Sequence, residues 1–395
     1  DDPPTGIVVK KMLGSARRVI TRGIGGAVNE YGAGGRSSVS GLQVALFGAT
    51  HTGDSAMTAR YVGAYLGQEG SRCRAANHGC EWETRSMKVN FDLGQFASPF
   101  YSPRDAESMK ACIGPYKIVV NCIGNYYETG NVVPTRRDGT WRSLSNVNYS
   151  YEEVHVDVAR RLARAAKEVG VDTFVHLSST YADPESPSRL ARSQAAGEVA
   201  VREEFPEAVI IRAPPMFGHE DRFLNWFALS ALYFRGYVPV IEDGQALVQP
   251  VFVQDVAKAI VKIVRQSQLL WPDYEKYVGK TFDLFGPLDY SRKELAEFVY
   301  DITKQDVTLV DTPAFLAHFA ARAIQVLPEP HLTEDDVILA QIDTVAPKDP
   351  APDVLTFKDL DLEPTPIEKI AFSYLHRFRE GGHFIIASGA QTRGV

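Results

Sequence analysis

A serine pair stands where a proton-transfer site would need one, at the end of the apolar run TFVHLSS. Carbonyl reduction on a nucleotide-binding fold uses a serine to orient the carbonyl and a tyrosine to exchange the proton. A lysine four residues after the tyrosine lowers its pKa. Ser178 and Ser179 fill the first role by position, but Leu190 and Gln194 occupy the slots for the tyrosine and the lysine. Neither side chain ionises near neutral pH, so we expect no catalytic residue here.

Two other tyrosines do not supply the missing pair. Tyr181 is followed four residues later by Glu185, in a turn-like segment. Tyr300 and Lys304 have the required spacing, but they lie more than a hundred residues beyond Ser178 and are interpreted as an ordinary helical turn. The chain has no G-x-S-x-G or H-E-x-x-H motif. The sequence therefore predicts neither catalytic nor metal-binding residues.

Gly48, Ala49 and Thr50 follow the first apolar run, where a dinucleotide-binding fold needs a glycine. There the backbone must approach a pyrophosphate held at the N-terminus of the next helix. A complete fingerprint has further glycines three and six positions later, and these positions hold His51 and Asp54. An aspartate would oppose the charge of the phosphates.

An insertion offers a second alignment of the same turn. If residues 51–55 are inserted, the two glycine positions hold Ala56 and Ala59, which are tolerable for helix packing. Two interpretations stay open: the turn still binds a nucleotide, or it survives only as part of the fold.

Further residues suit a bound dinucleotide. Asp92, which ends KVNFD, can accept from an adenine amino group, and the segment 121–124 closes the fourth run beside the expected cofactor path. His78 follows the second strand, where such folds distinguish a ribose hydroxyl from a 2′-phosphate, although an ordinary surface histidine is the alternative. The candidate cofactor-binding residues are Gly48, Ala49, Thr50, His78, Asp92, Cys122, Ile123, Gly124 and Ser178.

Short apolar runs alternate with helical segments over the region that must position these residues. This alternation predicts an α/β fold, a doubly wound, Rossmann-like parallel sheet covered by helices on both faces. The expected strands are LQVALFGA, KVNFDL, YKIVVNCIG, TFVHLSS and EAVIIRAPPMFG, and the expected helices cover residues 56–66, 152–169 and 194–205.

Changes of composition divide the chain further. We expect the dinucleotide-type domain at residues 42–240 and a smaller α/β lobe at 241–330, which includes a helix over 292–303. Residues 1–41 read as an extended arm with a net charge of +3. Residues 331–395 read as an acidic, proline-rich tail that ends in a helix over 367–378. Both arms have too little apolar periodicity to fold alone, so they are expected to dock on partners.

The composition excludes several classes of protein. At 395 residues and 45% hydrophobic, the chain can bury a large core. A net charge of −7 without a basic face argues against nucleic-acid binding. The four cysteines are too sparse for a disulfide framework, and the longest apolar stretch is too short to span a bilayer.

Several longer motifs point to one family. They are GRSSVSG before the first strand, DLGQ from Asp92, FPEAVII from Phe205, EDRFLN from Glu220 and QPVFVQDVAKAIV from Gln249. Together with TPIEKIAFSYLHRFR near the end, they resemble the dinucleotide-fold accessory subunit of mitochondrial complex I, the NADH:ubiquinone oxidoreductase. The resemblance covers roughly residues 35 to 380.

The resemblance implies an atypical short-chain dehydrogenase fold that serves assembly and stability. It implies a peripheral position on the matrix side of the inner membrane, among other complex I subunits near the quinone site, and a tightly bound NADPH. The family's loop looks like G-A-T-G-F-L-G and its ribose position carries an arginine, which His78 replaces here. Some relatives keep the tyrosine and lysine that Leu190 and Gln194 replace.

We therefore expect a non-catalytic accessory subunit. Two alternatives remain from other classes of function. One is a soluble NADPH-dependent reductase or epimerase, which needs a proton donor that the sequence does not supply. The other is a redox sensor, in which NADPH occupancy changes the affinity for partners without turnover. The sensor needs a working nucleotide site, so Gly48, Thr50 and His78 are the residues that discriminate it from the other interpretations.

Overall fold

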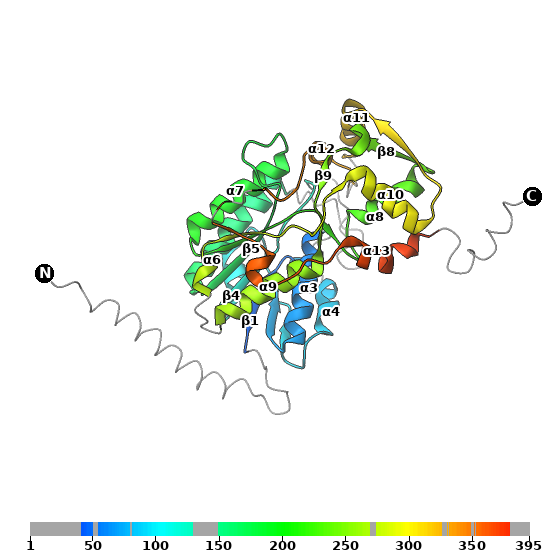
Figure 1. Ribbon diagram of the computed structural model, residues 1–395. Coiled ribbons are helices and arrows are strands. Elements are labelled where there is room, and N and C mark those ends of the chain that lie inside the picture. The colour runs from blue at the N-terminus through cyan, green and yellow to red at the C-terminus, as the bar shows by residue number, and fades with distance from the viewer. Residues whose placement is uncertain are drawn as a thin grey trace, which may run out of the picture.

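The computed structural model describes residues 41–49, 54–79, 81–128, 149–268, 274–325, 330, 332–348, 351 and 353–379. The arm expected at residues 1–41 lies outside the described residues apart from Gly41, as does Thr50. Helices and strands are named as in Figure 1.

Eight strands form one sheet in the order β14-β11-β6-β5-β4-β1-β2-β3, and every pairing is parallel (Figure 1). This confirms the expected doubly wound α/β fold. The strand order reverses between β1 and β4, and ligands bind such sheets at the carboxyl ends of the strands beside this point. The strands are β1 (Gln43–Phe47), β2 (Arg72–Ala75), β3 (Phe96–Ala97), β4 (Ile118–Asn121), β5 (Thr173–Ser179), β6 (Val209–Ala213), β11 (Thr281–Asp283) and β14 (Val354–Leu355).

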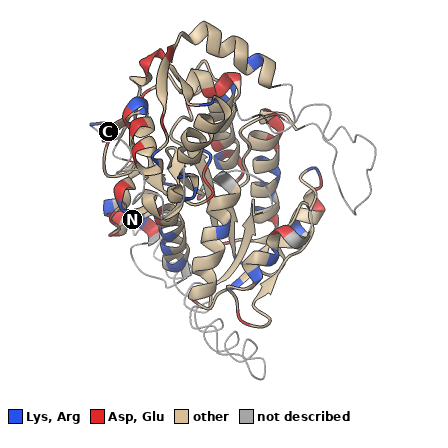
Figure 2. Ribbon diagram, turned by 90° about the vertical axis from the view of Figure 1, so that its right-hand side faces the viewer, with Lys and Arg blue, Asp and Glu red and all other residues tan. Residues whose placement is uncertain are grey.

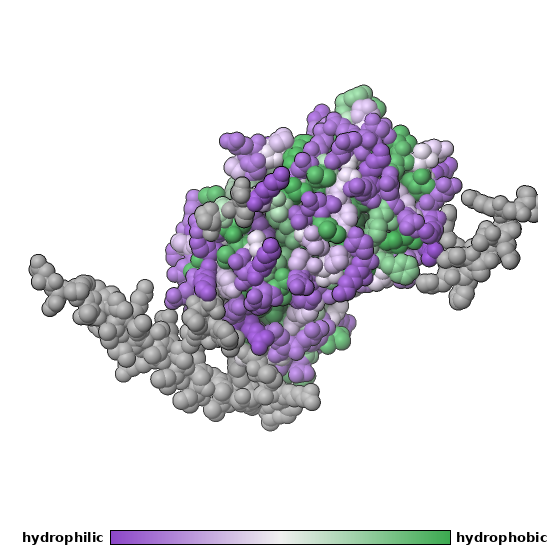
Figure 3. All heavy atoms as spheres, viewed as in Figure 1, coloured by the Kyte–Doolittle hydropathy of each residue, from purple (hydrophilic) through white to green (hydrophobic). Residues whose placement is uncertain are grey.

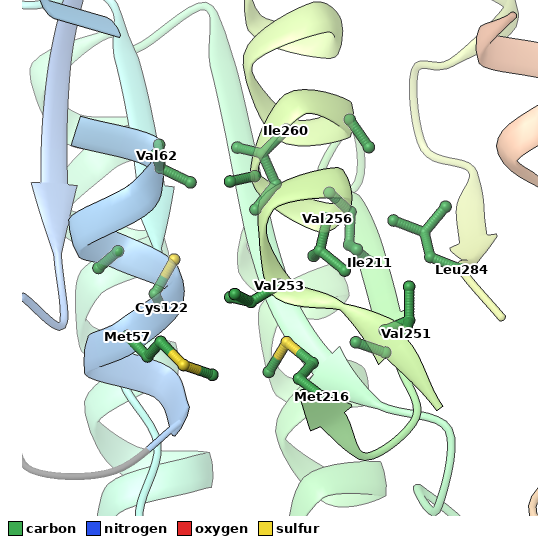
Figure 4. Packing of buried hydrophobic residues seen from close by; sticks show 14 of the residues in the cluster. Met57, Val62, Cys122, Ile211, Met216, Val251, Val253, Val256, Ile260 and Leu284 are labelled. Atoms are coloured by element: carbon green, nitrogen blue, oxygen red, sulfur yellow. The ribbon is translucent and has the colours of Figure 1, made fainter. Parts of the chain in front are cut away.

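Helices α3 (Asp54–Gln68) and α9 (Val253–Gln268) lie side by side on one face of the sheet (Figure 1). Figure 4 shows the apolar layer between them and the sheet, where Val62 and Ile260 approach each other. Both side chains are fully buried. Strands covered on both faces need apolar residues at successive positions, which explains why the expected strands are continuous apolar runs.

The opposite face is covered by α5 (Ala106–Ile113), α6 (Ala159–Val169) and α7 (Arg189–Glu204). A π-helical turn, η2 (Glu153–Val158), leads into α6 and packs against α7. Gly197 allows this approach, because a Cβ there would lie 2.4 Å from the carbonyl oxygen of His155. The expected helix over 152–169 corresponds to η2 and α6 together.

The chain returns to the sheet after residue 240. Strand β11 pairs with β6, β14 pairs with β11, and α9 packs on α3. The boundary expected at residue 240 would therefore cut α9 and two strands from the sheet that they complete. An amphipathic helix shows that it covers an apolar surface, but its pattern does not say which one.

A smaller lobe stands over the carboxyl end of the sheet. It contains α8 (Leu224–Tyr233), α10 (Arg292–Thr303), α11 (Ala314–Ile324) and α12 (Glu334–Leu339), and strand β8 (Tyr237–Ile241) pairs with β13 (Thr308–Thr312). Helix α10 matches the expected helix over 292–303, and a capping box between Ser291 and Glu294 starts it. Two short pairs, β7 (Met216–Phe217) with β10 (Val251–Phe252) and β9 (Leu247–Val248) with β12 (Tyr290–Ser291), link the lobe to the sheet.

The region expected to be an extended tail is folded over residues 332–348, which contain α12, and again over residues 353–379. Phe357 and Leu360 of the 3-10 turn η5 (Phe357–Leu360) are buried, as are Ile367 and Leu375 of α13 (Ile367–Leu375). The expectation that this part needs a partner to fold was wrong, because its few apolar residues reach the core of its own chain. Residues from 380 onward lie outside the described part.

KVNFDL, expected to be the strand that ends near Asp92, is not a strand. Helix α4 (Glu81–Lys88) ends at its first residue, and Val89 and Leu93 are 86% and 99% exposed. The alternation of apolar residues was misleading because Val89 and Leu93 are left uncovered, although Phe91 between them packs on Phe96 and the core. The strand of this unit is β3, whose Phe96 pairs with Cys73.

The surface carries mixed charge. Lys and Arg residues are interspersed with Asp and Glu along the helices in Figure 2. Within the described ranges, no helix has the length and apolar character needed to cross a membrane.

Candidate functional site

The glycine turn is built as a dinucleotide fold requires. Gly48 follows β1 with a φ of +99°, and a Cβ there would lie 2.4 Å from the carbonyl oxygen of Cys122. The turn therefore brings the carboxyl ends of β1 and β4 into direct backbone contact. Ala49 is buried beside it. Helix α3 begins at Asp54, and Ala56 and Ala59 are fully buried in its packing.

His78 lies just after β2, at the same edge of the sheet. Its Nδ1 is 3.4 Å from the carbonyl oxygen of Tyr101, and its Nε2 is 3.5 Å from the hydroxyl of Tyr149. The ring is half-buried between these tyrosines. Its neighbour Asn77, which the sequence analysis missed, is buried, and its Oδ1 has no hydrogen-bond partner among the described residues. A buried acceptor without a partner costs stability, and no donor among the described residues offsets this cost for Asn77.

Asp92 is not brought to this edge. It is exposed and precedes β3, so it lies toward the amino ends of the parallel strands, whereas Gly48 and His78 follow carboxyl ends. The proposed contact with adenine fails because KVNFD is not a strand and does not point its end at the cofactor path.

A pocket of about 290 Å³ lies between the carboxyl ends of β4, β5 and β6 and the smaller lobe. The predicted residues Cys122, Ile123, Gly124 and Ser178 line one wall, together with both slots of the missing pair, Leu190 and Gln194. Six residues singled out from the sequence therefore lie around one cavity. Gly48, Ala49 and His78 lie outside this wall, nearer the expected nucleotide path.

Ser178 is engaged by its own fold. Its hydroxyl donates a 2.6 Å hydrogen bond to Oε1 of Glu198, a buried residue of α7. Arg212 of β6 donates to both carboxylate oxygens of Glu198, with a closest distance of 2.6 Å. The bidentate pair balances the buried carboxylate. Ser178 thus belongs to a structural network in addition to lining the pocket.

Two buried histidines, missed by the sequence analysis, also line the pocket. Nε2 of His155 accepts from the backbone N–H of Asn125 at 3.1 Å, so its Nδ1 carries the proton and donates to Ser193 at 2.8 Å. Asn121 donates from Nδ2 to Nδ1 of His176 at 3.0 Å. Burial lowers the pKa of each histidine to about 4. Both rings are therefore neutral near pH 7 and are poor proton donors.

The lobe supplies the opposite wall. Arg222, Trp226 and Phe227 come from α8 or the turn before it, Arg292 begins α10, and Asp336 lies on α12. No sequence motif marks these residues, because they meet only when α8, α10 and α12 fold over the sheet. Tyr300 lies elsewhere and donates to the carbonyl oxygen of Phe227 at 2.8 Å, which supports its interpretation as a structural residue.

The described residues contain no cluster of three His, Cys, Asp or Glu side chains that could hold a metal ion. What the pocket offers is an apolar cavity with two arginines and one carboxylate, next to a glycine turn. It can hold an organic ligand beside a nucleotide. The positions that would transfer a proton to that ligand hold an alkyl group and an amide.

Sequence comparison finds relatives over most of the chain. The chain is 34% identical to "NADH dehydrogenase [ubiquinone] 1 alpha subcomplex subunit 9, mitochondrial" of Mus musculus, over 89% of this chain and 85% of the relative. The protein of the same name from Arabidopsis thaliana is also 34% identical, over 92% and 84%. The "NADH-ubiquinone oxidoreductase 40 kDa subunit, mitochondrial" of Neurospora crassa is 31% identical, over 89% and 83%.

Comparison of structures finds the same fold in enzymes. A triphenylmethane reductase of Citrobacter sp. complexed with NADP(H) has a TM-score of 0.58 at 16% identity and covers 85% of this chain and 99% of its own. A dTDP-glucose 4,6-dehydratase of Streptomyces venezuelae with NAD bound has a TM-score of 0.57 at 14% identity, over 86% and 98%. The family model described as "RmlD substrate binding domain" matches residues 146–325.

Proposed function

Since the chain belongs to the family of subunit 9 of the mitochondrial NADH dehydrogenase [ubiquinone] 1 alpha subcomplex, we propose that it is a non-catalytic accessory subunit of complex I that serves assembly and stability. The proposal that the protein has no catalytic turnover is supported by the residues of the pocket wall. Leu190 and Gln194 both line the pocket beside Ser178, where a reductase needs its tyrosine and lysine. Ser178 is held by Glu198, and neither histidine of the pocket supplies the missing proton.

Partner contacts are proposed for the smaller lobe as well as for the arms. Helix α11 exposes Phe315, Leu316 and Phe319, which are 69%, 50% and 77% exposed. Apolar residues gather in patches over the lobe in Figure 3. Exposed apolar patches of this kind mark interfaces between proteins. We place the protein on the matrix side of the inner membrane, peripheral and near the quinone site, with these residues against other complex I subunits.

A structural NADPH is part of the proposal. Gly48 gives the turn that a pyrophosphate needs, and Asn77 presents a buried acceptor without a partner at the end of β2. His78 would face the 2′-phosphate, and Gly124 and Ser178 would lie beside the nicotinamide. A bound nicotinamide nucleotide supplies hydride chemistry, whereas the residues of this chain would only bind and orient it. The assignment of Thr50 to the phosphate loop stays a prediction.

Native purification tests the proposal. The protein would be extracted from mitochondrial membranes under mild conditions, and bound nucleotide would be released with acid and quantified by mass spectrometry. Recovery in a large complex with NADH:ubiquinone oxidoreductase activity is the expected result, with about one NADPH per chain. The same complex without nucleotide would leave an architectural subunit and end the sensor alternative. Recovery as a small soluble species that oxidises NADPH would support the reductase alternative instead.

A pair of variants tests the interface. Phe315→Ser combined with Phe319→Ser should reduce recovery of the protein in the complex and leave its melting temperature unchanged, because both side chains are exposed. Val89→Ser combined with Leu93→Ser is the matched control, since these residues are as exposed but lie at the opposite end of the sheet. Equal loss in both variants would show that general surface polarity, rather than α11, governs assembly.

A further inference from the structure

One arginine of the pocket, Arg292, forms no ion pair with an acidic residue of the described part of the chain. Its Nε is buried without a hydrogen-bond partner. One terminal nitrogen, Nη2, donates to the hydroxyl of Tyr181 at 3.3 Å and to the carbonyl oxygen of Leu339 at 3.1 Å. These neutral acceptors orient the guanidinium but leave its charge uncompensated.

The rest of the wall does not cancel this charge. Asp336 is the one carboxylate among the described residues that line the pocket. Its Oδ2 accepts from the backbone N–H and the hydroxyl of Thr333. Burial raises the pKa of Asp336, against these hydrogen bonds and the nearby charge of Arg222, which lower it. Since both histidines are neutral and Asp336 forms no ion pair with Arg292, the guanidinium of Arg292 keeps its positive charge in the pocket. An anionic group would remove the cost of this unpaired charge.

Most of the remaining wall is apolar, apart from polar side chains such as Ser178, Gln194 and the two neutral histidines. Trp226, Phe227 and Met216 face it from the lobe side, and Leu190 and Leu339 add aliphatic surface. Such a cavity, with a few polar groups at one place, selects a ligand with an apolar body and one polar end. A water occupies about 30 Å³, so a cavity of 290 Å³ has room for roughly ten atoms of the size of a methylene group.

We propose that this pocket binds a single-chain carboxylate amphiphile, with the carboxylate on Arg292 and the alkyl chain against Trp226, Phe227 and Leu190. This inference goes beyond the proposed function, because it needs neither a nucleotide nor a partner subunit. The replacement of tyrosine by Leu190 removes the proton donor and adds a methyl-rich surface to the cavity. The same substitution thus suits a pocket that holds a lipid-like ligand without changing it.

Three ligands of related structure test the two halves of the proposal on the purified full chain. Octanoate, with about ten non-hydrogen atoms, matches the pocket. 1-Octanol has the same chain without the charge, and butyrate has the charge with a shorter chain. Titration calorimetry should give the tightest binding for octanoate, and both other ligands should bind at least about tenfold more weakly. Equal affinity for octanoate and 1-octanol, or no binding of either, would overturn the proposal.

Variants then locate the site. Arg292→Gln should weaken octanoate by about tenfold or more and leave 1-octanol unchanged, and Arg292→Lys should restore part of the preference. Leu190→Trp should fill the cavity and abolish binding of both. Arg265→Gln, which replaces an exposed arginine of α9, controls for loss of surface charge. If Arg292→Gln weakened both ligands equally, its role would be structural and the assignment of the carboxylate would be wrong. These results are independent of recovery in complex I, so either proposal can fail alone.

Discussion

The hydroxyl of Tyr374 donates a 2.9 Å hydrogen bond to Oδ2 of Asp221, a residue 153 positions earlier in the chain. The same oxygen accepts from the backbone N–H of Gly218 at 2.8 Å, and Oδ1 accepts from that of Asn225 at 2.9 Å. Asp221 therefore fixes the turn between β7 and α8, and Tyr374 ties α13 to that turn. All of these contacts are buried.

Tyr374→Phe should lower the free energy of unfolding by about 1–3 kcal/mol, because it removes one donor from a buried carboxylate without leaving a large cavity. Urea denaturation followed by circular dichroism measures the loss. Ser373→Ala, which changes an exposed hydroxyl of the same helix, serves as the comparison. If both variants were equally stable, the tie between α13 and the turn would contribute nothing measurable.

The contribution of Asp221 to stability should depend on pH. Burial raises its pKa from 3.8 to about 6, against the backbone hydrogen bonds that lower it. The folded state therefore binds more protons than the unfolded state between these values, so this contribution falls as the pH rises from about 4 to about 6. The difference in unfolding free energy between the wild type and Asp221→Asn should shift by roughly 3 kcal/mol across this window.

The exposed residue Asp289 gives the control for that experiment. Asp289→Asn removes an exposed carboxyl and is the control for the loss of a negative charge. A flat difference for Asp221→Asn would mean that its carboxyl is not perturbed in the folded protein.

The two pocket histidines should make the stability of the protein depend on pH in the opposite direction to Asp221. Burial lowers the pKa of His155 and of His176 from 6.5 to about 4, so the folded state resists protonation that the unfolded state accepts. Stability from these residues is present above about pH 6.5 and is lost as the pH falls toward 4. His176→Gln should flatten this acid limb by up to about 3 kcal/mol. Replacing the exposed His219 by Gln should leave the limb as steep as in the wild type.

Gly48→Ala should destabilise the protein by about 3–5 kcal/mol, since the new Cβ meets both a positive φ and the backbone of Cys122. Gly94→Ala is a matched control, because Gly94 has a φ of +84° but open space around it, and only the backbone term of about 1–2 kcal/mol applies. Thermal unfolding of both variants measures the difference. Equal losses would show that the β1 turn does not press against β4.

The parts of this fold that could be predicted are those in which a sequence pattern is compatible with a single local structure. The run TFVHLSS forms β5 (Thr173–Ser179), because a short apolar segment between two helices is typical of a buried strand in an α/β sheet. Ser291 and Glu294 set the start of α10. The prediction of a strand at KVNFDL failed because alternating apolar residues do not reveal whether any surface covers them. The prediction of an extended tail failed because a few buried residues such as Leu360 hold it to the core in spite of its prolines.

The candidate site likewise contains some residues that could be predicted from the sequence and others that could not. Cys122, Gly124 and Ser178 could be found because they follow strands whose carboxyl ends must meet. His155 carried no signal, since a histidine on the apolar face of a helix is common in protein cores. Arg292 and Trp226 come from separate parts of the lobe, and only their three-dimensional arrangement places them across from Leu190.

The position of β14 at the edge of the sheet also sets an order of events in time. Strand β6 can pair on its outer side only after residues 281–283, which form β11, have been synthesised. Strand β11 can in turn pair on its outer side only after residues 354–355 have been synthesised. Contacts so distant in sequence make folding slow and keep apolar edges open while the chain is incomplete. A chain emerging from a ribosome therefore cannot finish its nucleotide-type sheet until nearly all of the described residues have been synthesised.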